Sequence, residues 1–125
     1  MFEGILLPLI TPFKHNGEID SPVYRELAED AIRAGVHGIF LLGSQGQGPT
    51  LSEQERMEVA EQIIAHVNGR VPVIVHVGTT NAFSTIRLAK AAEEAGASSI
   101  AVIPPYYYSD HTKEEIDLHF RLVAE

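Results

Sequence analysis

Short apolar runs alternate with longer amphipathic stretches along the whole chain. The runs are rich in β-branched and aliphatic residues and predict β-strands. The predicted strands are residues 5–10, 37–42, 71–77 and 98–103. The stretches between and after them carry apolar residues at helical spacing. The predicted helices are residues 21–34, 52–67, 81–95 and 112–124. Continuous apolar strands suit a parallel sheet, so the pattern predicts four βα units in one α/β domain spanning residues 1–125.

The predicted helices are bounded by residues with capping chemistry. Asp20 or Ser21 is suited to cap the first helix, which has a proline in its first turn. Two later helices begin with the spacing of a capping box. These pairs are Ser52 with Glu55 and Thr112 with Glu115. A glycine follows each of the first three helices, where a left-handed residue ends a helix. These glycines are Gly35, Gly69 and Gly96.

Two architectures accommodate four βα units, and periodicity does not separate them. One is an open doubly wound sheet, and the other is half of a (βα)8 barrel. In both, ligands bind in the loops at the carboxyl ends of the strands. The chemistry is therefore expected in residues 11–20, 43–50, 78–80 and 104–111.

Composition narrows the classes of function. The 125 residues include no cysteine, which excludes disulfides and thiolate chemistry, and the net charge of −8 disfavours nucleic acid and anionic membranes as partners. The apolar runs are far shorter than the roughly 20 residues that span a bilayer. The N-terminal segment carries an acidic residue in place of a basic one, so it does not read as a signal peptide. We expect a cytoplasmic α/β domain that binds a small molecule or a protein partner.

The loop after the second predicted strand reads Gly-Ser-Gln-Gly-Gln-Gly-Pro-Thr over residues 43–50. Its glycines let the backbone approach a ligand, and Gly46 or Gly48 can adopt a positive φ. Exposed N–H groups there, with the Ser44 hydroxyl, would hold a carboxylate or phosphate. The loop lacks the Lys-Ser/Thr ending of a P-loop and the spacing of a dinucleotide fingerprint. The pattern alone is equally consistent with a tight βα turn that binds nothing.

Other candidate groups are less informative. Tyr106, Tyr107 and Tyr108 follow the fourth strand, where a phenol can relay a proton or pack in an interface. His76 lies inside the third strand and is interpreted as a packed histidine more readily than as a pocket residue. The six histidines lack metal-ligand spacing, so no metal site is expected. All three lysines fall outside predicted strands and read as surface charges. They are Lys14, Lys90 and Lys113.

Several motifs occur together in an order and spacing known from one enzyme family. They are residues 4–13, Gly17 with Ile19 and Asp20, residues 35–38, Gly43 with Gly46, Leu51 and Ser52 with Glu55 and Arg56, residues 71–74, and residues 105–107. Together they resemble the dihydrodipicolinate synthase / N-acetylneuraminate lyase family of class I pyruvate aldolases, over essentially the whole chain. Residues 46–51 and 106–108 look most similar to its 2-keto-3-deoxygluconate aldolase-like branch.

The resemblance implies a role for particular residues. Gly43, Ser44, Gln45 and Gly46 correspond to the loop that binds the carboxylate of pyruvate. Ser44 stands where the family has a catalytic Thr or Ser hydroxyl, whereas Gln45 replaces a second hydroxyl residue and Gln47 replaces the usual Glu. Tyr107 matches the tyrosine that reaches across a tight dimer and completes a proton relay. No cofactor is implied.

The resemblance also implies that these residues form the N-terminal (βα)4 half of a barrel. The family's Schiff-base lysine lies on the sixth strand and its catalytic tyrosine on the fifth, and neither has a counterpart here. The chain alone is therefore expected to be inactive as a lyase, whether it is a fragment, a natural half-barrel or an engineered one. We expect it to form a homodimer or higher oligomer that covers the open strand edges. The alternative is a non-catalytic half-barrel that binds a small carboxylate such as pyruvate or another 2-oxo acid, or that serves only as an assembly unit.

Overall fold

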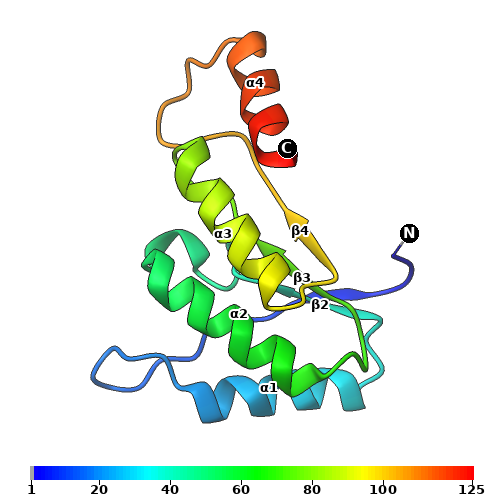
Figure 1. Cartoon of the computed structure of the whole chain (residues 1–125). Helices are drawn as coiled ribbons and strands as arrows, with labels where there is room; N and C mark the ends of the chain where they lie inside the picture. The colour runs from blue at the N-terminus through cyan, green and yellow to red at the C-terminus, as the bar shows by residue number, and fades with distance from the viewer. Residues whose placement is uncertain (1) are drawn as a thin grey trace.

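A computed structural model describes residues 2–125 and contains one parallel sheet with four helices (Figure 1). The strands are β1 (Leu6–Pro8), β2 (Gly38–Leu41), β3 (Val73–His76) and β4 (Ser99–Ala101). The helices are α1 (Ser21–Arg33), α2 (Glu53–Val67), α3 (Ala82–Glu94) and α4 (Lys113–Ala124), and a short 3-10 turn η1 (Gly48–Thr50) precedes α2. The predicted alternation of strands and helices is confirmed.

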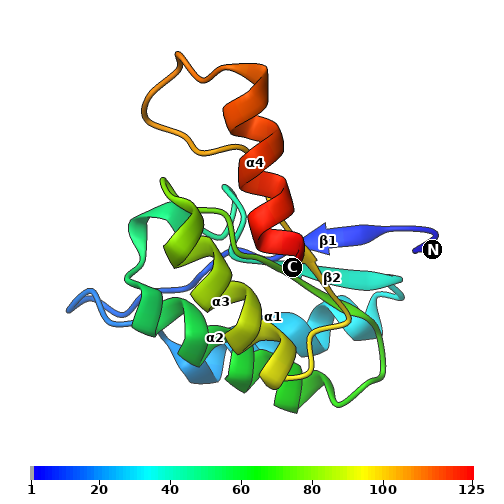
Figure 2. The same cartoon turned by 45° about the horizontal axis from the view of Figure 1, so that its top comes forward.

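The order of the strands separates the two architectures that the sequence left open. All neighbours pair in parallel in the order β1-β2-β3-β4. A doubly wound sheet needs the order to reverse, which places helices on both faces. Here α1, α2 and α3 lie side by side against one face, and α4 follows at the end next to α3 and β4 (Figures 1 and 2). The fold is therefore the (βα)4 half of a TIM barrel.

The hydrophobic core lies between the sheet and the helices. Ile39 and Leu41 of β2 are fully buried there against Ala28 of α1 and Ile63 of α2. Side chains alternate along a strand, so the next residues face the other side of the sheet. On that side Ile10 and Ile103 are 53% and 40% exposed. Among residues 2–125, no helix covers this inner face (Figure 2).

The predicted caps are present. The Ser52 hydroxyl accepts from the amide of Glu55, whose carboxylate accepts in return from the Ser52 amide, and Thr112 forms the same capping box at α4. Asp20 caps α1 through its carboxylate. The glycines expected after α1, α2 and α3 all have positive φ, as predicted. Local sequence therefore determines where the helices begin and end.

The strands are shorter than the apolar runs that predicted them. The difference is clearest after β2, where Leu42 takes a φ of 63° and leaves the extended conformation. β1 and β4 each have a single strand neighbour, and each contains only three residues. Within residues 2–125, no helix has the length and apolar character needed to cross a membrane.

Candidate functional site

The loop at the carboxyl end of β2 folds into a tight turn closed by its own backbone. The Gln47 amide donates to the Ser44 carbonyl at 3.1 Å, and the Gly48 amide donates to the Gly43 carbonyl at the same distance. The Gln47 carbonyl accepts from both the amide and the hydroxyl of Thr50. These bonds fix the orientation of the peptide units from residue 43 to residue 48.

The same bonds decide where the unpaired donors point. In a trans peptide the C=O and the following N–H point in opposite directions, and the described residues contain no cis peptide. Because the carbonyls of Gly43 and Ser44 turn inward, the amides of Ser44 and Gln45 turn outward. Within residues 2–125 neither amide has a hydrogen-bond acceptor, and the Ser44 hydroxyl is also unpaired. Two adjacent N–H groups and one hydroxyl are thus available to an anion.

The glycines of this turn are required for space rather than for a left-handed conformation. A Cβ on Gly48 would lie 1.8 Å from the carbonyl oxygen of Leu42, and one on Gly46 would lie 3.0 Å from the carbonyl oxygen of Leu9. Neither glycine uses the positive φ that it could adopt. Gln47 takes the left-handed conformation instead, with φ 53°. The turn packs so closely on the ends of β1 and β2 that a side chain at Gly48 requires the backbone to move, and one at Gly46 would be tight.

A buried pair of hydroxyls from the first βα unit holds this turn from beneath. The Thr11 hydroxyl donates to the Gly46 carbonyl at 2.5 Å and lies 3.3 Å from the hydroxyl of Tyr24 on α1. Thr11 is 4% exposed and Tyr24 is 1% exposed. Burial raises the pKa of the Tyr24 phenol above its usual value, although the bond to Thr11 opposes this. Sequence reasoning included Thr11 only as part of the first expected loop and missed Tyr24, because the bond from Thr11 to Gly46 joins positions 35 residues apart.

Arg56 supports the neighbouring strand end. Its guanidinium is 3% exposed and donates to the carbonyls of His76 and Gly78 at 2.7 and 3.1 Å. Burial lowers the pKa of Arg56, and the nearby Tyr106 and Glu53 oppose that effect. His76 is 6% exposed, so its interpretation as a packed histidine is confirmed. Burial and the positive Arg56 lower the pKa of His76, while a backbone hydrogen bond at Leu42 opposes the shift.

The tyrosines after β4 lie on an extended loop and do not meet the turn as a group. Tyr106 is half-buried and lies near enough to Arg56 to oppose the lowering of the Arg56 pKa by burial. Tyr107 is 84% exposed, has a φ of 86°, and stacks edge-on with Tyr108 at 5.0 Å. A positive φ is strained for a bulky residue. Within residues 2–125 Tyr107 has no hydrogen bond to the turn at residues 43–48.

The lysines occupy the surface, as predicted. Lys14 pairs with Glu18 at 3.1 Å on an exposed loop, and Lys90 and Lys113 are exposed on their helices. Within residues 2–125 none of them forms a hydrogen bond with the turn at residues 43–48. The described part of the chain also contains no group of three or more His, Cys, Asp or Glu side chains placed to hold a metal ion.

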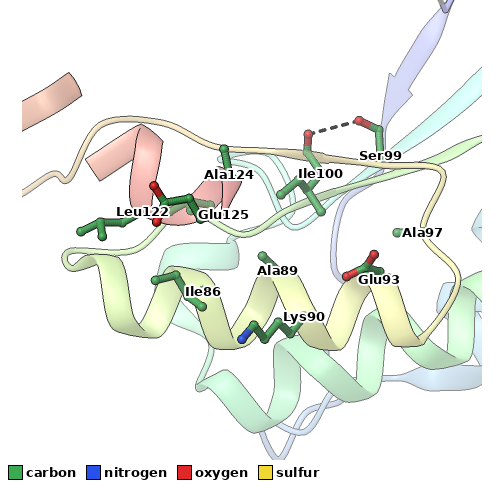
Figure 3. Close-up of a pocket in the computed structure, with 11 residues that line it drawn as sticks. Ile86, Ala89, Lys90, Glu93, Ala97, Ser99, Ile100, Leu122, Ala124 and Glu125 are labelled. Carbon is green, nitrogen blue, oxygen red and sulfur yellow. Dashed lines mark hydrogen bonds between the residues drawn. The ribbon is translucent and has the colours of Figure 1, made fainter. Parts of the chain in front are cut away.

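A cleft of about 680 Å³ lies elsewhere, between α3, β4 and the last turn of α4 (Figure 3). Ile86 and Ala89 of α3, Ile100 of β4 and Leu122 of α4 contribute its apolar wall. The cleft is on the helix side of the sheet; Lys90 lies on its wall (Figure 3), and none of the candidate residues from the turn at residues 43–48 or from residues 106–108 lines it. The cleft is therefore separate from the turn at residues 43–48.

The sequence of this chain is similar to those of known proteins over its whole length. The sequence profile of the Dihydrodipicolinate synthetase family matches residues 1–125. The chain belongs to this family. A 4-hydroxy-tetrahydrodipicolinate synthase from Thermotoga petrophila is 37% identical over all 125 residues, which correspond to 42% of that protein. The putative 2-dehydro-3-deoxy-D-gluconate aldolase YagE of Escherichia coli K12 is 45% identical over 108 residues, which cover 86% of this chain and 36% of YagE.

Solved structures of the dihydrodipicolinate synthetase family superpose closely on this fold. YagE in complex with pyruvate matches with a TM-score of 0.95 and 42% identity over 99% of this chain and 41% of that one. An enzyme named CdNal from Clostridium difficile, solved with mannosamine, gives 0.95 at 26% identity over 99% of this chain and 43% of its own. The chain thus spans about two fifths of the length of the relatives that it matches. The relatives are synthases, lyases and aldolases, which places the family in pyruvate aldolase and lyase chemistry.

Proposed function

We propose that these residues supply the carboxylate-binding part of a class I pyruvate aldolase or lyase. The observation that carries the proposal is the pair of unpaired amides on Ser44 and Gln45, which face the same way beside the Ser44 hydroxyl. A carboxylate with two oxygens suits two adjacent donors. The relative YagE was solved with pyruvate, which is a small 2-oxo acid.

In the proposed reaction, the keto carbon of pyruvate condenses with a lysine amine and loses water to give an imine. Loss of a methyl proton gives an enamine, which adds to the carbonyl carbon of an aldehyde while the aldehyde oxygen takes up a proton. Water then hydrolyses the product imine and frees the lysine; cleavage is the reverse. The amine must be desolvated to be a nucleophile at neutral pH. Lys14, Lys90 and Lys113 are all exposed, so we infer that the amine comes from outside these 125 residues and that the chain alone does not turn over.

Ser44 and Tyr107 complete the proposed chemistry. The unpaired Ser44 hydroxyl is free to orient the substrate or to pass a proton. Tyr107 projects from its loop in a strained conformation and is 84% exposed, which suits a side chain that acts in a neighbouring protomer. We place the branch nearer to the 2-keto-3-deoxygluconate aldolases, on residues 46–51 and 106–108. The proposed location of the protein is the cytoplasm.

The open inner face and the free edges of β1 and β4 support a further part of the proposal. Unpaired strand edges and exposed apolar residues favour association. Where these 125 residues are the whole polypeptide, we propose a homodimer or higher oligomer in which β1 of one copy meets β4 of another. Two such half-barrels would close an eight-stranded barrel.

Titration of the nitrogen-15-labelled chain with pyruvate tests the binding role. We expect the amide resonances of Ser44 and Gln45 to shift saturably, and we expect pyruvamide, which lacks the carboxylate, to leave them in place. Equal shifts with pyruvamide, or no shift with pyruvate, would contradict the carboxylate site.

Borohydride trapping with pyruvate, measured by intact mass, tests the catalytic inference. We expect no pyruvyl adduct on the 125-residue chain. An adduct at that mass would mean that one of the three lysines acts as the nucleophile, and the inference of inactivity would be wrong. Pyruvate binding without an adduct is also the outcome expected for a non-catalytic carboxylate-binding module, so an active pairing with a matched C-terminal half distinguishes the two.

A further inference from the structure

We propose that Thr11 and Tyr24 are positioning residues that set the direction of the Ser44 and Gln45 amides, an inference that rests on the proposed carboxylate site. The two side chains form a buried hydrogen-bonded chain that ends on the Gly46 carbonyl. Neither residue lies in the turn, and neither has a donor directed at a ligand there.

The direction of each hydrogen bond in this chain follows from its chemistry. A carbonyl oxygen only accepts, so the single hydroxyl proton of Thr11 is committed to Gly46. The 3.3 Å contact between Thr11 and Tyr24 is then donated by the phenol of Tyr24. Burial keeps that phenol protonated, because it raises the pKa of Tyr24. A hydroxyl whose oxygen accepts a hydrogen bond becomes a stronger donor through its own proton. The bond from Tyr24 to Thr11 therefore strengthens the bond from Thr11 to the Gly46 carbonyl.

The effect reaches the binding amides through one peptide unit. The peptide between Gly46 and Gln47 is held at both ends: its carbonyl by Thr11 and its N–H by the Ser44 carbonyl. Once the Ser44 carbonyl is fixed inward, the Gln45 amide in the same peptide unit must point outward. Removing the Thr11 hydroxyl leaves a buried carbonyl unpaired, which favours rotation of this peptide toward water. The Gln45 amide then loses its fixed direction.

The left-handed conformation of Gln47 adds to this dependence. Gln47 follows the held peptide directly and has a φ of 53°, which is strained for a residue with a side chain. Such a conformation persists only where surrounding contacts impose it. The Thr11 bond is the one contact to the Gly46 carbonyl within residues 2–125. Its loss should therefore relax Gln47 toward negative φ.

The test compares Thr11→Val, Thr11→Ser and Tyr24→Phe with Thr85→Val in the 125-residue chain. Thr85 is also fully buried and hydrogen-bonded, to Thr79 and Asn81, but it does not contact residues 43–48. It thus controls for the loss of a buried threonine hydroxyl. The first measurement is the pyruvate dissociation constant. The second, in the ligand-free protein, is the set of amide chemical shifts of Ser44 and Gln45 together with the three-bond coupling between the amide proton and the α-proton of Gln47, which reports its φ.

We expect Thr11→Val to weaken pyruvate binding roughly tenfold and to move the Gln47 coupling toward the value for negative φ. Thr11→Ser keeps the hydroxyl donor, so its pyruvate dissociation constant should stay within about twofold of the wild-type value. The dissociation constant of Tyr24→Phe should fall between those of Thr11→Ser and Thr11→Val. Thr85→Val should change neither measurement. If Thr11→Val does not fold, the contrast between Tyr24→Phe and Thr11→Ser decides the question.

Two outcomes would overturn the proposal. In one, Thr11→Val or Tyr24→Phe leaves the turn resonances and the Gln47 coupling unchanged. In the other, Thr85→Val shifts them as strongly as Thr11→Val does. Failure of the proposed function gives a different result: the wild type binds no pyruvate, while the ligand-free turn still responds to Thr11→Val and not to Thr85→Val.

Discussion

The Arg56 guanidinium lies 2.7 Å from the carbonyl oxygen of His76, so a side chain of α2 fixes the carboxyl end of β3. The bond is buried, and a second bond from the same guanidinium reaches Gly78. β3 ends at His76, and in the turn that leads from it to α3 the backbone carbonyls no longer have an amide of a neighbouring strand to accept from. A buried cation that donates to two of them replaces the missing ladder bonds.

Arg56→Ala should therefore destabilise the protein strongly. The substitution leaves two buried carbonyls without a donor and removes a large packed side chain, which together cost about 3 kcal/mol of the free energy of unfolding. Arg33→Ala, at a residue whose side chain is 69% exposed, serves as the control and should change that free energy by less than about 1 kcal/mol. Urea unfolding followed by circular dichroism gives both values. Similar losses for the two variants would show that the buried bonds contribute little.

Two buried histidines, His76 and His119, should make the free energy of unfolding depend on pH. Burial is the main cause that lowers the pKa of both His76 and His119; Arg56 adds to the effect at His76 and His111 at His119, whereas backbone contacts at Leu42 and Ile103 oppose it. The unfolded chain, with histidine pKa values near about 6.5, then binds more protons than the folded chain. The free energy of unfolding should be highest above that pH and should decline as the pH falls from it through the lower folded values.

Proton NMR of the imidazole rings measures this directly. We expect the folded midpoints of His76 and His119 below about 6.5. The carboxylates with lowered pKa values, such as Glu53 beside Arg87, lose their contribution only at more acidic pH, so the two phases are separable. Folded midpoints at or above the unfolded value would contradict the assignment. So would a free energy of unfolding that increases as the pH is lowered from 7 to about 5.5.

The parts of this fold that depend on near neighbours could be predicted from the sequence. The Ser52–Glu55 capping box joins residues three apart, and its partners are visible in a single turn of sequence. The contact between Thr11 and Gly46 has no such signal, because the sheet brings together residues that are 35 positions apart. The same holds for Arg56: its motif is visible in the sequence, but its partners, His76 at the end of β3 and Gly78 just after it, are not.

The sequence locates the glycine-rich turn but does not say what each glycine does there. Glycine permits a positive φ, and also the close approach of another backbone, and sequence does not distinguish the two. Here Gly48 needs the room and Gln47 takes the positive φ. The choice depends on how the turn packs against Leu42 and the end of β1, which is a tertiary contact.

Gly48→Ala should disrupt this turn more than a change at an adjacent exposed position. The added Cβ would lie 1.8 Å from the Leu42 carbonyl oxygen, so the backbone must move. We expect a loss of about 2 kcal/mol in the free energy of unfolding and altered amide resonances at residues 43–48. Pro49→Ala, at the next and exposed residue, is the control and should lose less than half as much. Unchanged resonances in Gly48→Ala would mean that the turn accommodates a side chain.

The open inner face should control self-association of the 125-residue chain. Ile103 follows β4 on that face, and the helix side of the sheet is occupied by its neighbours Ile100 and Val102. Ile103→Lys places a charge where two copies would meet. We therefore expect its dissociation constant for self-association to be at least about tenfold higher than that of the wild type. Val23→Lys makes the same change on α1, at a residue that is also 40% exposed, and should leave association unchanged. Sedimentation velocity from 1 to about 100 micromolar measures both. A wild-type chain that stays monomeric over this range would refute association through the open face, and equal weakening by Val23→Lys would locate the interface elsewhere.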